Sequence, residues 1–114
     1  MGTMAPEFVE LTVQIVRFVD DYQPGIVECE FTDAGGRLHR LIDKAPIFTT
    51  ATLTADSIYP QPGAVRCKLV RAWQDTNGRR LFTVSTADPF SIETGEGLAE
   101  FDVLPSQVSP INRP

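Results

Sequence analysis

Residues 22–31 read Tyr22-Gln23-Pro24-Gly25-Ile26-Val27-Glu28-Cys29-Glu30-Phe31, and a related stretch returns as Tyr59-Pro60-Gln61-Pro62-Gly63-Ala64-Val65-Arg66-Cys67-Lys68-Leu69. Each copy runs on to a turn of the same form, Asp33-Ala34-Gly35-Gly36-Arg37 in the first and Asp75-Thr76-Asn77-Gly78-Arg79 in the second. Apolar and polar residues alternate in both copies, which is the period of a β-strand. The repeat therefore predicts two similar strand–turn–strand units.

The alternation extends to other parts of the chain. Residues 8–15 place apolar side chains at every second position, and the phase changes near Val16, which indicates a β-bulge. A similar change near Val70 predicts a second bend. We expect six strands, over residues 8–19, 26–32, 37–43, 64–74, 81–86 and 98–104. Six strands with closely spaced turn signals predict an all-β fold, a small six-stranded antiparallel barrel or a half-open sandwich.

The domain organisation is expected to be simple, since 114 residues suit one domain. Residues 1–7 form an N-terminal extension, part of which could derive from an expression vector if Met4 is the natural start. Residues 8–104 form the barrel, and residues 105–114 form a proline-rich tail that we expect to be poorly ordered. The connection over 44–61 is expected to hold a short strand at 47–50 and one helical turn at 56–59. Long connections of this kind often carry the binding function.

The charge balance bears on the class of partner. The net charge is −5, which repels phosphate backbones and anionic lipid and favours a neutral or basic protein. The chain shows no signal-peptide pattern and no apolar run long enough to span a bilayer, so we expect a cytoplasmic protein without a membrane partner. These features are typical of the small acidic interaction domains of bacteria.

The two repeats carry opposite charges at equivalent outward positions. Glu28 and Glu30 in the first copy correspond to Arg66 and Lys68 in the second. If the two strands are neighbours, these side chains could form cross-strand ion pairs that select the register. The alternative is two solvated faces that never meet.

The cysteines occupy matching inward positions in the two repeats. We expect Cys29 and Cys67 to be reduced, buried thiols that act as small hydrophobes. A disulfide and a nucleophilic cysteine assisted by His39 are the alternatives, and an enzyme built on Cys29, Cys67 and His39 is the least favoured function. A metal site of Cys29, His39, Asp43 and Cys67 lacks the close ligand pairs that zinc sites use. We therefore expect no catalytic residue, no metal and no cofactor.

The sequence leads to two functional hypotheses. The first is a non-catalytic interaction module, such as an inhibitor or adaptor for a basic protein. The alternative is a barrel that binds single-stranded nucleic acid, although the net charge disfavours it. Its candidate binding residues are basic or aromatic: Arg66, Lys68, Arg71, Trp73, Arg79 and Arg80. The protein could be a monomer or a homodimer, the latter formed through an uncovered edge at residues 8–15 or 98–104.

Overall fold

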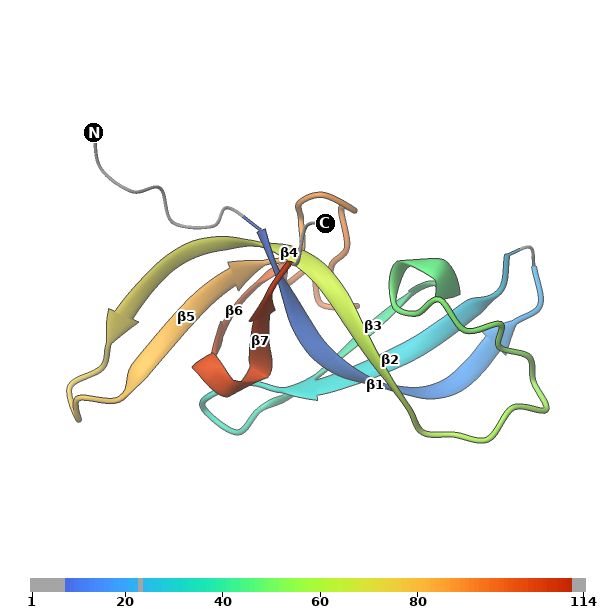
Figure 1. The fold of residues 1–114 in the computed structure, drawn as a ribbon, viewed down its shortest axis with the longest axis horizontal. Coiled ribbons are helices and arrows are strands. Elements are labelled where there is room, and N and C mark those ends of the chain that lie inside the picture. Colours follow the sequence, from blue (N-terminus) through green and yellow to red (C-terminus); the bar gives the residue numbers. More distant parts are fainter. Residues whose placement is uncertain (1–7, 23, 112–114) are drawn as a thin grey trace.

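The computed structural model describes residues 8–22 and 24–111, and its fold is all-β (Figure 1). The six main strands are β1 (Phe8–Asp20), β2 (Ile26–Thr32), β3 (Leu38–Lys44), β4 (Gln61–Gln74), β5 (Arg80–Ser85) and β6 (Glu100–Val103). Two 3-10 turns, η1 (Ala45–Ile47) and η2 (Pro105–Gln107), and a short strand β7 (Val108–Pro110) complete it. The six predicted strands are confirmed within a few residues of their expected ends.

All neighbouring strands are antiparallel, and their order in the sheet is β3-β2-β1-β4-β5-β6. The sheet curls into a half-open barrel, in agreement with the predicted fold class (Figure 1). β7 pairs with the first part of β1, so the predicted proline-rich tail adopts regular structure over residues 105–110. The proposed N-terminal extension, residues 1–7 with Met4, lies outside the described residues.

The long strand β1 organises both repeats. The β2–β3 hairpin pairs with its second part and the β4–β5 hairpin with its first part, so the two repeats flank one central strand. β1 is irregular after Ile15, and β4 is irregular after Leu69, which confirms the bends expected near Val16 and Val70. Each irregularity changes which residues face inward and curves the strand around the core.

The turns of the two repeats have the same hydrogen bonds. Asp33 Oδ1 accepts from the backbone N–H groups of Gly35 and Arg37, and Asp75 Oδ1 accepts from those of Asn77 and Arg79. A glycine with positive φ, Gly36 or Gly78, occupies the fourth position in each turn. A β-branched or bulky residue would be strained there.

A third turn of this form, at residues 94–98, was not predicted from the sequence. Thr94 replaces the aspartate, and its Oγ1 accepts from the N–H groups of Glu96 and Leu98. Gly97, again fourth in the turn, has a φ of 87°. The sequence does contain a signal for this turn. As in the two repeats, a residue with a side-chain oxygen is followed three positions later by a glycine, and the next residue donates its N–H to that oxygen.

The core fills the concave side of the sheet. Val9, Leu11, Val13 and Ile15 of β1 are buried there, as their alternation predicts. They pack with side chains from every other long strand and from the connections: Val27, Cys29, Phe31, Leu41, Phe48, Val65, Cys67, Val84, Ile92, Phe101 and Val103. Burial of this apolar set provides the main driving force for folding.

The barrel is closed by loops where strand pairing ends. The Ala34 N–H donates to the Asp102 carbonyl at 2.8 Å, which joins the β2–β3 turn to β6. Gln107 Nε2 donates to the Thr32 carbonyl at 2.7 Å, and the buried Ile92 anchors the loop between β5 and β6 in the core. At one end of the sheet, β3 pairs only with β2, so its other edge stays open.

Several expectations for the connection over 44–61 were wrong. Of the residues expected as a strand at 47–50, Ile47 ends η1 and 48–50 follow it without strand pairing. Residues 56–59 form a turn and bends rather than a helical turn. β4 begins at Gln61, three residues before its expected start, and Pro62 and Gly63 belong to it. Because Gly63 has no side chain, the Phe48 carbonyl can approach the backbone of β4 closely.

Candidate functional site

The six residues proposed for nucleic-acid binding do not share one surface. Arg66 and Lys68 lie on the outer face of β4, and the bulge at Val70 brings Arg71 and Trp73 onto that face too. The strand alternation then places Arg80 on the opposite face, because it pairs with Gln74. Arg79 lies in the β4–β5 turn, where its Nε donates to Asp75 Oδ2 at 3.2 Å.

Trp73 contacts Arg71 and Thr83 and is not a core residue. The Arg71 guanidinium lies 4.6 Å from its ring centroid, which is a cation–π arrangement. Its Nε1–H donates to Thr83 Oγ1 at 2.9 Å, and Thr83 donates in turn to Asp102 Oδ1 at 2.6 Å. The outer face thus carries a carboxylate beside the cations, and Glu10 lies opposite Arg66 across the β1–β4 ladder.

The expected ion pairs between the two repeats do not form. β2 and β4 lie on opposite sides of β1, so Glu28 and Glu30 cannot reach Arg66 and Lys68 across a ladder. Glu28 instead bonds to Arg17 of β1 and lies 3.6 Å from Arg40 of β3, which also bonds Glu30 at 2.9 Å. The hypothesis was wrong because cross-strand partners depend on strand order, which the local pattern does not encode.

The cysteines are free and buried, as the favoured interpretation predicted. Cys67 lies opposite Val9 and Cys29 opposite Ile15, six residues further along β1. That spacing corresponds to about 20 Å of strand, which excludes a disulfide between them. Burial raises the pKa of both thiols to about 12, so they are protonated at neutral pH and poor nucleophiles.

His39 is a buried partner of a turn aspartate rather than of a thiol. Its Nε2 lies 2.8 Å from Asp33 Oδ2, and its ring packs against Phe31 and Phe101. Nδ1 has no hydrogen-bond partner among the described residues. Residues 8–22 and 24–111 also contain no group of three potential metal ligands, so Cys29, His39, Asp43 and Cys67 are not brought together as one.

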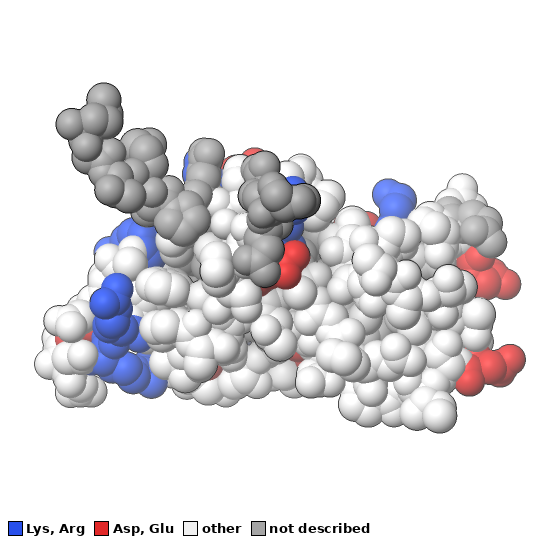
Figure 2. Space-filling view, in the orientation of Figure 1, with Lys and Arg blue, Asp and Glu red and all other residues white. Residues whose placement is uncertain are grey.

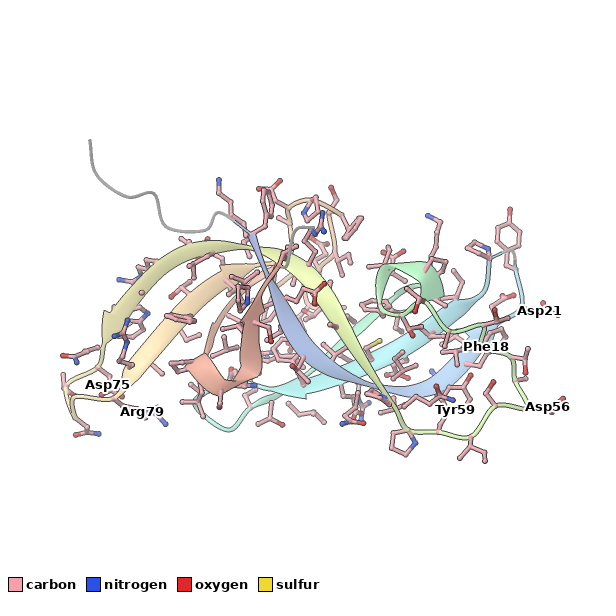
Figure 3. All side chains as sticks on the ribbon, in the orientation of Figure 1. Phe18, Asp21, Asp56, Tyr59, Asp75 and Arg79 are labelled. Atoms are coloured by element: carbon pink, nitrogen blue, oxygen red, sulfur yellow. The ribbon has the colours of Figure 1, made fainter. Side chains whose placement is uncertain are left out.

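Charge is separated along the molecule. Figure 2 shows lysines and arginines gathered over the end that carries the β4–β5 hairpin, and carboxylates at the opposite end. Asp21 and Asp56 lie at this second end, together with Phe18 and Tyr59 (Figure 3). The molecule measures 47 × 34 × 23 Å, so the two charged regions are far apart along its long axis.

The second end also presents the two most exposed large apolar side chains in the described part of the chain. Tyr22 is 75 % exposed and Ile58 is 83 % exposed. We call this end of the molecule, which carries Asp20, Asp21, Tyr22, Asp56 and Ile58, the acidic end. Among the described residues, none of its three carboxylates forms an ion pair.

Hydrogen bonds fix both loops of the acidic end. The Tyr22 N–H donates to Asp20 Oδ1 at 2.8 Å, and the Gly25 carbonyl accepts from the Ala45 N–H at 2.9 Å. In the second loop, the Tyr59 hydroxyl donates to the Thr54 carbonyl at 2.7 Å.

Further bonds hold the backbone around Ile58. The Thr54 N–H donates to Ser57 Oγ at 2.9 Å, and Gln61 Nε2 donates to the Ile58 carbonyl at 3.0 Å. The sequence pointed to the 44–61 connection, but it could not show that this connection and the Asp20–Asp21 turn lie at the same end of the molecule.

No helix among the described residues is long and apolar enough to cross a bilayer. Comparison with known proteins found no matching family model, no matching curated protein and no matching solved structure.

Proposed function

We propose that this protein is a non-catalytic interaction module that binds a positively charged protein through its acidic end. The observation that carries the proposal is the combination, at one end of the molecule, of three carboxylates without described ion-pair partners and the two most exposed apolar side chains. Exposed aromatic and aliphatic groups supply the binding free energy at interfaces. The carboxylates supply long-range attraction that speeds association with a basic surface.

Two further features support this function. The hydrogen bonds around Tyr22 and Ile58 hold their loops before binding, which lowers the conformational entropy lost in a complex. The two free cysteines also fit a protein that meets its partner in a reducing compartment such as the cytoplasm.

The test compares matched variants of the full chain in a pull-down from cytosolic extract. Tyr22→Ala/Ile58→Ala removes the apolar groups of the acidic end, and Val70→Ala/Phe90→Ala removes two exposed apolar side chains elsewhere. A specific partner should be retained by the wild type and by the second variant and lost from the first. Retention by both variants would contradict the proposal.

The role of charge is tested with the partner protein that the pull-down retains. It should be basic, and its association rate measured by surface plasmon resonance should fall at least ten-fold between 50 and 500 mM salt. Asp20→Asn/Asp21→Asn/Asp56→Asn should lower the rate at low salt to a similar degree. An association rate that does not depend on salt would remove charge as the reason for binding.

A second candidate function is the binding of single-stranded nucleic acid by the outer face of β4. It is favoured by the bulge that aligns Arg71 and Trp73 with Arg66 and Lys68. Salt-sensitive binding of labelled oligonucleotides, reduced at least ten-fold by Arg66→Glu/Lys68→Glu, would support it. Absence of binding at low salt would leave the protein-interaction function alone.

A further inference from the structure

β3 is an edge strand. Its only strand partner is β2, and within residues 8–22 and 24–111 its backbone groups have no hydrogen-bond partner in another segment apart from β2. An antiparallel strand in this position leaves every second N–H and C=O free for another strand. From the sequence, the uncovered edge was expected at residues 8–15 or 98–104. Residues 8–15 belong to β1, which pairs with β4 on one side and with β7 and β2 on the other. The second range contains β6, the other end strand of the sheet, whose Asp102 carbonyl accepts from the Ala34 N–H.

A cavity of about 740 Å³ adjoins this edge. Leu38, Arg40 and Ile42 of β3 line one side of it, and residues 93–96 line the other. We call it the β3 groove. Its volume falls within the range of sites that hold small ligands or short peptide segments.

The far wall of the β3 groove is fixed in place. Ile92 is buried in the core just before the wall begins, and the Thr94 turn closes it with backbone and side-chain hydrogen bonds. Glu96 forms an ion pair with Arg37, the residue that leads into β3. A ligand would therefore enter a preformed groove rather than order a loose loop.

The side chains of the groove define what would bind. Leu38 and Ile42 are 48 % and 50 % exposed and point to the same side of β3, so they offer apolar contacts to side chains on one face of an added strand. The carboxylate of Glu93 has no ion pair among the described residues. Arg40, the cation of the groove, already bonds Glu30 and lies near Glu28. A cationic ligand side chain would thus find Glu93 available.

We propose that the β3 groove binds an extended segment of a partner protein, rich in apolar residues and lysine or arginine, by adding it to β3 as an extra strand. Backbone hydrogen bonds to the free edge would give affinity, and Leu38, Ile42 and Glu93 would select the side chains. This site shares no residue with the acidic end, so either site can fail without the other.

The test uses a labelled, acetylated heptapeptide of alternating valine and lysine and the full-length protein. Fluorescence anisotropy should show binding, and an alternating valine–glutamate heptapeptide should bind at least ten-fold more weakly. Of two analogues, N-methylated at the valines or at the lysines, at least one should lose ten-fold or more in affinity because methylation removes the N–H groups that face β3. Absence of binding, or binding of both methylated analogues as tightly as the unmethylated peptide, would overturn the proposal.

The position of the bound peptide on the protein is tested by amide hydrogen exchange and by matched variants. With the valine–lysine peptide, alternate amides of residues 38–44 should exchange at least ten-fold more slowly, and protection elsewhere alone would overturn the assignment. Glu93→Lys should weaken binding at least ten-fold, whereas Glu100→Lys, the same charge change outside the groove, should alter it less than two-fold. Protection of β3 that rises with protein concentration without peptide would show that a second copy of the chain occupies the edge, against the proposal.

Discussion

Asp33 Oδ2 lies 2.8 Å from Nε2 of His39, six residues further along the chain, and this contact joins the β2–β3 turn to a side chain inside the barrel. The equivalent oxygen of Asp75 in the other repeat bonds only the exposed Arg79. The same turn is therefore tied to the core in one repeat and to the surface in the other.

Asp33→Ala should destabilise the protein more than Asp75→Ala. Both substitutions remove the hydrogen bonds that close a turn, but only the first leaves the Nε2 of a side chain that is 5 % exposed without its partner. An unsatisfied buried polar group costs about 1–3 kcal/mol. Urea unfolding of the two variants at pH 7 measures the difference, and equal losses would mean that the contact with His39 adds no stability.

Because of the Asp33 carboxylate, the free energy of unfolding should depend on pH in the acidic range. Burial raises the pKa of Asp33, but the hydrogen bonds from His39, Arg37 and Gly35 lower it by more, so its pKa is below the ordinary value. The unfolded state then binds the proton more readily than the folded state. This contribution to stability is complete above the unfolded pKa, near 4, and is lost as the pH falls through the folded pKa.

The difference in unfolding free energy between the wild type and Asp33→Ala should accordingly be smaller at pH 2.5 than at pH 7. Urea titrations at several pH values between these limits measure it. A difference that stays constant over this range would show that the charge of Asp33 contributes nothing.

Much of the fold could be predicted because local sequence patterns determine its strands, turns and bends. The alternation in residues 8–15, the repeated turns and the phase changes near Val16 and Val70 all depend on near neighbours in the chain. The partners of Glu28 could not be predicted, since they depend on which strands become neighbours. The acidic end could not be predicted for the same reason, because the loops that carry Asp21 and Asp56 are distant in the sequence and reach the same end of the molecule only in the folded chain.

Gly63→Ala should destabilise the protein because the site has no room for a methyl group. A Cβ at this position would lie 3.0 Å from two side-chain atoms of Ile15 and 3.0 Å from the Phe48 carbonyl oxygen, and a backbone oxygen cannot move aside cheaply. Overpacking of this kind costs about 1–3 kcal/mol. Gly95→Ala is the matched control, since nothing lies within 4 Å of its added Cβ. Thermal unfolding of both variants measures the effect, and equal melting temperatures would contradict the predicted contact.

The thiols of Cys29 and Cys67 should react only when the protein unfolds. Burial raises their pKa to about 12, whereas an unfolded cysteine ionises near 9, so the folded state holds its thiol protons more tightly. The stability from these neutral thiols is complete below pH 9 and is lost as the pH rises towards 12.

At pH 8 only about one thiol in ten thousand is ionised, and neither sulfur is accessible. Iodoacetamide labelling followed by mass spectrometry should find both cysteines unmodified in buffer and both modified in denaturing urea. Rapid labelling of either cysteine under native conditions would show that the strand carrying it opens without global unfolding.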